Sequence, residues 1–161
     1  MILLAVGTQF SFDRLVQAVD AWAVKAGRSD IQAQIGPSSY KPMAMKSFSL
    51  IGPDDFRKMQ IDSEIMIAHA GMGSILAALE FSKPIIIFPR DHNLGEHRNG
   101  HQLATAKRFE GVPGVYVAYD LDKLNNLLEN IASLQAPGAI SDSAPAEFVN
   151  NLRSYIDDFS H

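Results

Sequence analysis

The segment that restricts the fold most is Ile85–Phe88, four consecutive apolar residues between Pro84 and Pro89. A strand that is apolar at every position has both of its faces covered, which is typical of a parallel sheet with helices on either side. The runs Ile2–Val6 and Ile65–Ala68 are also continuously apolar, and each is followed by a glycine-containing turn. We therefore predict an α/β domain with a mostly parallel sheet.

Strands alternate with helices along the rest of the chain, without internal repeats. This alternation predicts a single Rossmann-like domain, in which ligands bind beyond the carboxyl ends of the strands. Apolar periodicity and turn residues predict strands at 2–6, 31–35, 48–51, 65–68, 85–88 and 115–118, and helices at 12–26, 53–59, 75–81, 97–109 and 121–134. We expect a core of residues 1–134, a linker-like stretch at 135–144, and a terminal helix at 145–161 that packs on the core.

The composition argues against several classes of protein. The formal net charge is −4 and no run of lysine or arginine concentrates positive charge, so nucleic-acid binding is not expected. The absence of cysteine excludes disulfides, thiolate nucleophiles and cysteine-based zinc sites. No stretch approaches the roughly 18 apolar residues of a membrane span, and the apolar start lacks the basic flank of a signal peptide. We expect one cytoplasmic domain, since two nucleotide-binding domains need about twice 161 residues.

The turn His69–Ser74, between a predicted strand and a predicted helix, has the features of an anion site. Gly71 and Gly73 let the backbone approach a ligand, and Ser74 is expected to cap the helix. Free N–H groups and the helix dipole at such a position favour a phosphate or diphosphate. The alternative is a glycine turn that only allows the helix to pack closely on the strand. Gly7-Thr8 after the first strand is a second, weaker ligand contact or a plain turn.

A polar segment, residues 90–102, follows the most apolar strand. Its donors and acceptors suit a ligand rich in hydroxyl groups, and the alternative is a solvated loop without function. A metal site on His97 and His101 beside Glu96 is disfavoured, because the order is not His-Glu-x-x-His and Gly100 weakens the helix. Nucleophilic catalysis by Ser74 is disfavoured as well, because no Gly-x-Ser-x-Gly elbow is present.

These motifs occur in the order and spacing of the glycosyltransferase family 28 C-terminal domain, which the chain resembles over roughly residues 1–110. The motifs in question are Val6-Gly7-Thr8, His69–Ser74, Lys83–Pro89 and His101–Ala104. Three further segments resemble most the small split subunits of bacterial exopolysaccharide (glucuronosyl) transferases, which are related to the small subunit of the eukaryotic UDP-GlcNAc transferase. These segments are Phe12–Leu15, Gln34–Gly36 with Tyr40, and Gly95–Gln102.

The resemblance implies the C-terminal half of a GT-B glycosyltransferase, the half that holds a UDP-sugar. The residues that would bind the nucleotide diphosphate are Gly7, Thr8, His69, Gly71, Met72, Gly73 and Ser74, and those that would face the sugar are Arg90, His101 and Gln102. A general base on this chain would be His97 or Glu96. One departure from the family concerns the ribose of the nucleotide. In the peptidoglycan member of the family, an acidic residue in the helix after the glycine turn binds the ribose, and the matching residue here is Ala77.

The activity implied by the resemblance is inverting transfer of a sugar from UDP-sugar to a lipid-linked saccharide acceptor in exopolysaccharide biosynthesis. No cofactor or metal requirement is predicted, because backbone N–H groups and a helix dipole can stabilise the leaving diphosphate. The implied partner is a membrane-anchored, acceptor-binding subunit that recruits the chain to the inner face of the membrane. The alternatives are a non-catalytic UDP-sugar-binding or regulatory module and a stand-alone phosphate-binding enzyme.

Overall fold

The computed structural model describes residues 1–138. The strands are β1 (Ile2–Ala5), β2 (Ile31–Gln34), β3 (Met45–Phe48), β4 (Ile65–His69), β5 (Ile85–Phe88) and β6 (Val115–Val117). The helices are α1 (Asp13–Ala26), α2 (Pro53–Asp62), α3 (Met72–Glu80), α4 (His101–Phe109) and α5 (Leu121–Glu129), with 3-10 turns η1 (His92–Leu94) and η2 (Ile131–Ser133). The terminal helix predicted at 145–161 and residues 139–144 of the linker-like stretch lie outside the described residues.

The strands of residues 1–138 form one sheet in the order β3-β2-β1-β4-β5-β6, and every neighbouring pair is parallel. The prediction of a mostly parallel α/β domain is therefore confirmed. The strand order reverses between β1 and β4, so the loops that follow these two strands diverge to opposite faces of the sheet. In open α/β sheets, ligands bind in the crevice at this position, beyond the carboxyl ends of the strands.

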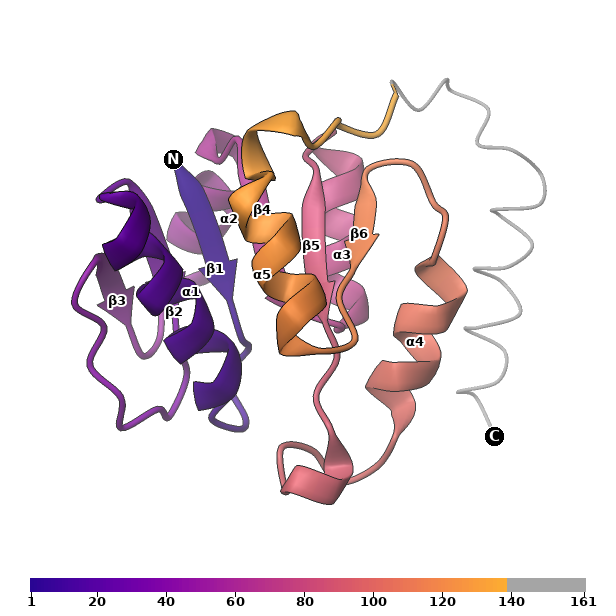
Figure 1. Ribbon diagram of the computed structural model, residues 1–161, viewed down its shortest axis with the longest axis horizontal. Helices are drawn as coiled ribbons and strands as arrows, with labels where there is room; N and C mark the ends of the chain where they lie inside the picture. The colour runs from indigo at the N-terminus through magenta and orange to yellow at the C-terminus, as the bar shows by residue number, and fades with distance from the viewer. Residues whose placement is uncertain (139–161) are drawn as a thin grey trace.

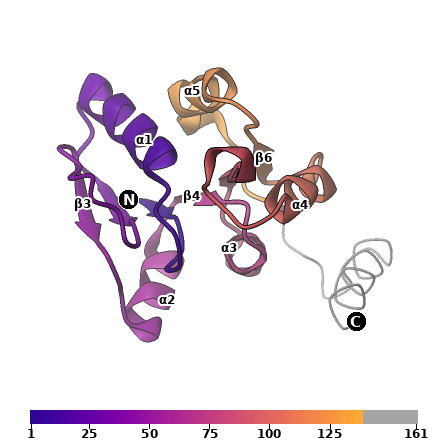
Figure 2. The ribbon, with the colours of Figure 1, turned by 90° about the horizontal axis from the view of Figure 1, so that it is seen from below.

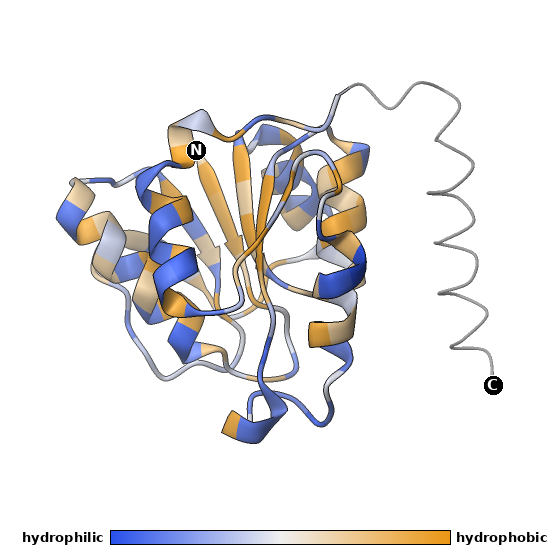
Figure 3. Ribbon diagram, turned by 45° about the vertical axis from the view of Figure 1, so that its right-hand side comes forward, coloured by the Kyte–Doolittle hydropathy of each residue, from blue (hydrophilic) through white to orange (hydrophobic). Residues whose placement is uncertain are grey.

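Helices cover both faces of the sheet and make a three-layered molecule (Figures 1 and 2). One core lies between the sheet and α1 with α5, and the other between the sheet and α2, α3 and α4. Successive residues of β5 alternate between them, since Ile86 and Phe88 join the first core and Ile85 and Ile87 the second. All four side chains are buried, which confirms that this strand is covered on both sides. Figure 3 shows apolar strands between the helices of the two outer layers.

The third strand lies at Met45–Phe48, so the prediction of a strand at 48–51 is wrong by three residues. Met45 is buried, whereas Lys46 and Ser47 are exposed at the edge of the sheet. Leu50, whose apolar side chain suggested the later strand, is 69% exposed. Backbone pairing with β2 defines this edge strand, and it therefore lacks the apolar pattern on which the prediction depended.

The prediction of a helix from 97 to 109 is correct only from His101 onward, because α4 starts there after Gly100. The residues before it form η1 and an irregular turn, and Gly95 ends η1 with a φ of 72°. His97 therefore precedes the helix, and the i,i+4 relation on which a shared metal site with His101 depended does not exist. In residues 1–138, no three metal-ligating side chains are grouped in a way that would hold an ion.

The start of the linker-like stretch is anchored to the domain. The hydroxyl of Tyr116 accepts a hydrogen bond from the N–H of Gln135 at 2.7 Å and donates one to its carbonyl at 3.1 Å. Pro137 packs against Gly114, where a Cβ would come within 2.4 Å of its ring. Within the described part of the chain, none of the helices is long and apolar enough to cross a membrane.

Candidate functional site

A cleft of about 420 Å³ opens at the carboxyl edge of the sheet, next to the point where the strand order reverses. It lies between the loops that follow β1, β4 and β5, and this edge is at the bottom of Figure 1. The predicted site residues in its lining are Gly7, Thr8, His69, Gly71, Met72, Arg90, His97, His101 and Gln102. The fold therefore brings together three segments that are far apart in the sequence. Gly73, Ser74 and Glu96 are not part of the lining.

The amino-terminal ends of α3 and α4 both border the cleft, through Met72 and His101. The first N–H groups of an α-helix have no acceptor within the helix and carry a partial positive charge. An acidic residue stands in the first turn of α1, α2 and α5, whereas the first turns of α3 and α4 contain none. The positive ends of these two helices are therefore not neutralised locally and favour an anion in the cleft.

Ser74 does not cap α3, so that prediction is wrong. The capping position is Gly71, no side chain accepts a hydrogen bond there, and Ser74 already belongs to the first helical turn. The helix begins three residues earlier than the predicted start at Ile75, because the turn after β4 is tighter than the sequence suggests. The N–H groups of Met72, Gly73 and Ser74 thus remain available to a ligand.

The glycines of the turn have different roles. A Cβ at Gly71 would lie 2.1 Å from the imidazole of His69, so this glycine makes room for the ring. Gly7, with a φ of 82°, approaches the same ring, since its Cβ would lie 3.1 Å from Nε2. A Cβ at Gly73 would meet nothing within 4 Å, and this residue is exposed beside the cleft. The packing alternative therefore explains Gly71, whereas open space surrounds Gly73.

Gln34 at the end of β2 fixes the loop that follows β1. Its Oε1 accepts a hydrogen bond from the N–H of Gly7 and its Nε2 donates to the Gly7 carbonyl, both at 2.9 Å. Nε2 also donates to the carbonyl of Ser49 at 3.2 Å. A nearly fully buried side-chain amide thus holds Gly7 in the lining of the cleft. No sequence pattern indicates this role of Gln34, because its partner Gly7 lies 27 residues away in the chain.

Arg90 ties the loops around the cleft together. Its Nη1 donates to the carbonyls of Ser11 and Glu96, and its Nη2 to those of Val6 and Phe10, at 2.6–3.1 Å. The side chain is 4% exposed, and burial lowers the pKa of Arg90 to about 10, which leaves the guanidinium charged at neutral pH. Because four carbonyls occupy both terminal nitrogens, the prediction that this guanidinium faces a sugar is not supported by its geometry.

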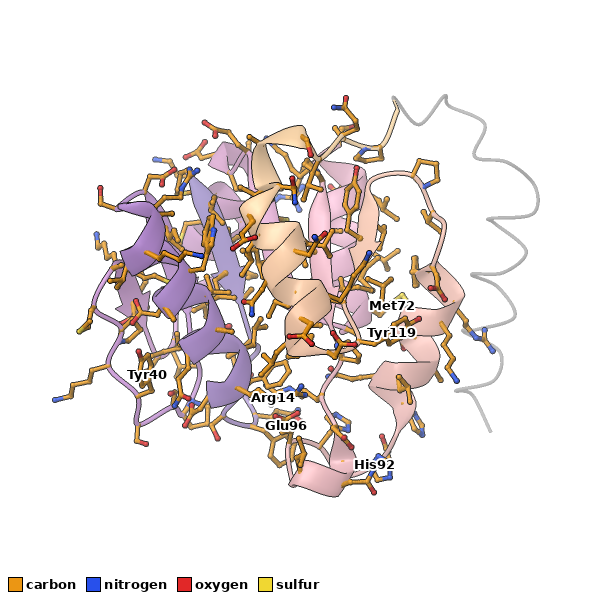
Figure 4. All side chains as sticks on the ribbon, viewed as in Figure 1. Arg14, Tyr40, Met72, His92, Glu96 and Tyr119 are labelled. Atoms are coloured by element: carbon orange, nitrogen blue, oxygen red, sulfur yellow. The ribbon has the colours of Figure 1, made fainter. Side chains whose placement is uncertain are left out.

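Glu96 and Arg14 form the outer support of the same loops, and Figure 4 shows the two side chains next to each other. Arg14 binds the carboxylate of Glu96 in a bidentate pair at 2.7 and 2.8 Å, and the N–H of Asp91 donates to it at 2.8 Å. The guanidinium of Arg14 also lies over the buried ring of Phe88, 4.3 Å from its centroid. The geometry of Glu96 thus opposes its prediction as a general base, because the carboxylate is held outside the cleft lining.

His97 lies in the cleft lining, half-buried, with its ring tilted against that of Phe10 at a centroid distance of 5.9 Å. Its Nδ1 lies 3.2 Å from Oδ1 of Asn99 and 3.3 Å from the Asn99 carbonyl. Since His97 reaches the cleft and Glu96 does not, His97 is the better placed of the two predicted bases.

His69 and Gln102 meet across 33 residues of sequence, with Nε2 of Gln102 2.9 Å from Nδ1 of His69. Burial lowers the pKa of His69, the charge of Arg90 lowers it further, and His97 adds to the effect. The resulting pKa is about 4. His69 is therefore neutral at physiological pH.

This low pKa predicts a loss of stability in mild acid. In the unfolded chain His69 has an ordinary pKa near 6.5, so the unfolded state binds a proton between pH 6.5 and 4 and the folded state does not. Above pH 6.5 His69 is neutral in both states and does not lower the free energy of unfolding. As the pH decreases from 6.5 to 4, protonation of the unfolded state lowers the free energy of unfolding by up to about 3 kcal/mol. Urea unfolding of the wild type and of His69→Asn between pH 7 and 4 measures it. Parallel pH profiles for the two proteins would refute the assignment.

Comparisons with known proteins find chains of similar sequence and fold. The model of the glycosyltransferase family 28 C-terminal domain matches residues 1–157. The human UDP-N-acetylglucosamine transferase subunit ALG13 is 29% identical over 154 residues, which cover 89% of this chain but only 13% of that protein. The NMR structure of ALG13 aligns with a TM-score of 0.61 at 17% identity, over 90% of this chain and 91% of that one. Acinetobacter baumannii MurG aligns with a TM-score of 0.59 at 16% identity, over 83% and 42%.

Proposed function

Because this chain belongs to the glycosyltransferase family 28 C-terminal domain family, we propose that it is the donor-binding subunit of a two-component inverting glycosyltransferase. The donor is a UDP-sugar, and the acceptor is a lipid-linked saccharide in exopolysaccharide biosynthesis. The observation that carries the proposal is the convergence of two helix amino-termini, both without an acidic first turn, on a cleft where the strand order reverses.

The diphosphate of the donor is proposed to bind at the start of α3. The N–H groups of Met72, Gly73 and Ser74 supply donors there, and the free space at Gly73 leaves room for phosphate oxygens. When the sugar is transferred, the leaving UDP gains negative charge. Fixed N–H groups and the helix dipole stabilise that charge without reorganisation, so the proposal requires no metal.

The sugar is proposed to lie toward the start of α4, next to His101 and Gln102. Oε1 of Gln102 accepts one hydrogen bond from the N–H of Arg90, and Nε2 uses one N–H on His69. One lone pair and one N–H of the amide therefore remain for sugar hydroxyls. His97 at the cleft is the proposed base if this chain supplies it. Arg90 acts as a positioning residue that holds the surrounding loops, since its terminal nitrogens bind backbone carbonyls.

The acceptor is proposed to bind on a second, membrane-anchored subunit that covers the open side of the cleft and brings this chain to the cytoplasmic face of the membrane. One observation supports a partner, since the human relative is described as a subunit. The chain spans 13% of the length of that human relative, so the activity of the whole relative is not carried over.

Transfer can be tested with membranes from source cells that lack this chain. Purified wild-type protein is added together with UDP-glucose, UDP-N-acetylglucosamine or UDP-glucuronic acid carrying a radiolabelled sugar. We expect label in the lipid extract for at least one donor, only when both protein and membranes are present. Tight UDP binding without any transfer would instead favour a non-catalytic binding or regulatory module. Turnover by the isolated chain would contradict the two-component proposal.

A further inference from the structure

The orientation of the Gln102 amide follows from its contact with the backbone of Arg90. The N–H of Arg90 lies 3.1 Å from one end of this amide in a buried position. A backbone N–H only donates, so the atom that faces it must be the carbonyl oxygen Oε1. The NH₂ group of Gln102 therefore points in the other direction, toward His69.

This orientation determines the protonation of His69. The NH₂ of Gln102 lies 2.9 Å from Nδ1 of His69, and because an NH₂ group only donates, Nδ1 must accept and carries no proton. A neutral imidazole has one N–H, which must then be on Nε2. The tautomer of His69 is thus set by a chain of three groups that begins at the backbone of Arg90.

The remaining nitrogen of His69, Nε2, is available to a ligand. A Cβ on Gly7 would lie 3.1 Å from Nε2, which places this nitrogen next to the loop after β1. In residues 1–138, every buried side-chain nitrogen or oxygen has a hydrogen-bond partner, and the bond of His69 is made by Nδ1. Nε2 is therefore accessible to solvent, and His69 belongs to the lining of the cleft.

We propose that Gln102 is a positioning residue that keeps His69 as the Nε2–H tautomer, so that His69 presents a permanent hydrogen-bond donor, and no acceptor, to an anionic oxygen of the ligand. This inference deepens the proposed function and rests on it for the identity of the ligand. It also gives Gln102 a role that does not depend on contact with a sugar. His69 consequently does not act as a base toward the cleft.

The surroundings of His69 keep its Nε2–H group protonated and its ring neutral over the physiological pH range. Arg90 and His97 are the titratable groups near the ring that oppose its protonation, and the buried position of the ring opposes it as well. An imidazole that stays neutral down to low pH does not change between donor and acceptor when the pH varies near neutrality. The ligand therefore meets the same hydrogen-bonding pattern from pH 6 to 8.

The inference is tested on the ligand-free protein by ¹⁵N NMR of the imidazole nitrogens, with His69→Asn used to assign the His69 signals. We expect an unprotonated Nδ1 and a protonated Nε2 from pH 6 to 8 in the wild type. In Gln102→Glu the carboxylate accepts from Nδ1–H, so the tautomer inverts and the titration midpoint of His69 rises by about 1–3 pH units. In the uncharged Gln102→Leu, both tautomers are expected. An Nδ1–H signal in the wild type would overturn the inference.

Gln60→Glu is the matched control, because Gln60 is also a nearly buried glutamine but lies on α2, outside the cleft lining. We expect it to leave the His69 signals unchanged. An equal shift in both Glu variants would show a general charge effect and contradict the positioning role.

A second measurement separates this inference from the proposed function. At pH 8, Gln102→Glu should bind UDP at least about 10-fold more weakly than the wild type, because Nε2 has become an acceptor. If the wild type does not bind UDP but shows the predicted tautomer, the proposed function fails and the positioning role of Gln102 stands. If the wild type binds UDP but shows a proton on Nδ1, the positioning role of Gln102 fails and the proposed function stands.

Discussion

Replacing Arg90 with alanine is expected to lower the free energy of unfolding by about 4 kcal/mol. The substitution leaves four backbone carbonyls without their donor, and these carbonyls lie on the two loops that follow β1 and β5. Arg90→Lys should recover less than half of the loss, since one ammonium group cannot reproduce the planar fork. Urea unfolding at pH 7 gives the values.

Arg57→Ala provides the control for loss of an arginine. Arg57 forms an ion pair with Glu80 at 3.0 Å, with both side chains more than half exposed, so its removal should cost about 0.5 kcal/mol or less. A similar small loss for Arg90→Ala would show that the loops around the cleft do not depend on this residue.

The second large effect is expected from Gly73→Glu, which should weaken UDP binding at least about 100-fold. The new carboxylate would occupy the first turn of α3, where the diphosphate is proposed to bind, and would neutralise the helix dipole there. The fold should be retained, because a Cβ at Gly73 meets nothing within 4 Å and an acidic residue in a first helical turn is stabilising. Calorimetric titration with UDP measures the affinity.

Two variants separate charge from position in that experiment. Gly138→Glu adds the same charge where a Cβ also has free space and should bind UDP like the wild type. Gly73→Ala adds only a methyl group and should have an intermediate effect. Equal affinities for Gly73→Glu and Gly138→Glu would refute the diphosphate site at α3.

The sheet could be predicted from the sequence where burial dictates residue type. The central strands β1, β4 and β5 are apolar because both of their faces are covered, and their limits agree with the pattern to within a residue. The edge strand β3 could not be placed, because backbone pairing rather than burial defines it. The start of α4 was misplaced, because the polar run through His97 continues into the helix without a change in pattern.

The location of the site was predictable, whereas its internal connections were not. Glycines and polar residues after the central strands indicated the loops that form the cleft, and His69 and Gln102 do meet there. The contacts that hold these loops join residues 27 to 84 positions apart, such as Gln34 with Gly7 and Arg90 with Val6. No periodicity in the sequence reports such pairs. The sequence therefore indicates no role for Arg14 or Gln34, and it suggests a base at Glu96, whose ion pair with Arg14 it does not show.

The central claim, that this domain binds the UDP moiety of a sugar donor without a metal, is tested most directly by calorimetric titration of the wild-type chain with UDP in the presence of EDTA. We predict saturable binding of one UDP per chain, with the same affinity when magnesium replaces EDTA. No saturable binding at millimolar UDP, or binding that appears only with magnesium, would contradict the account.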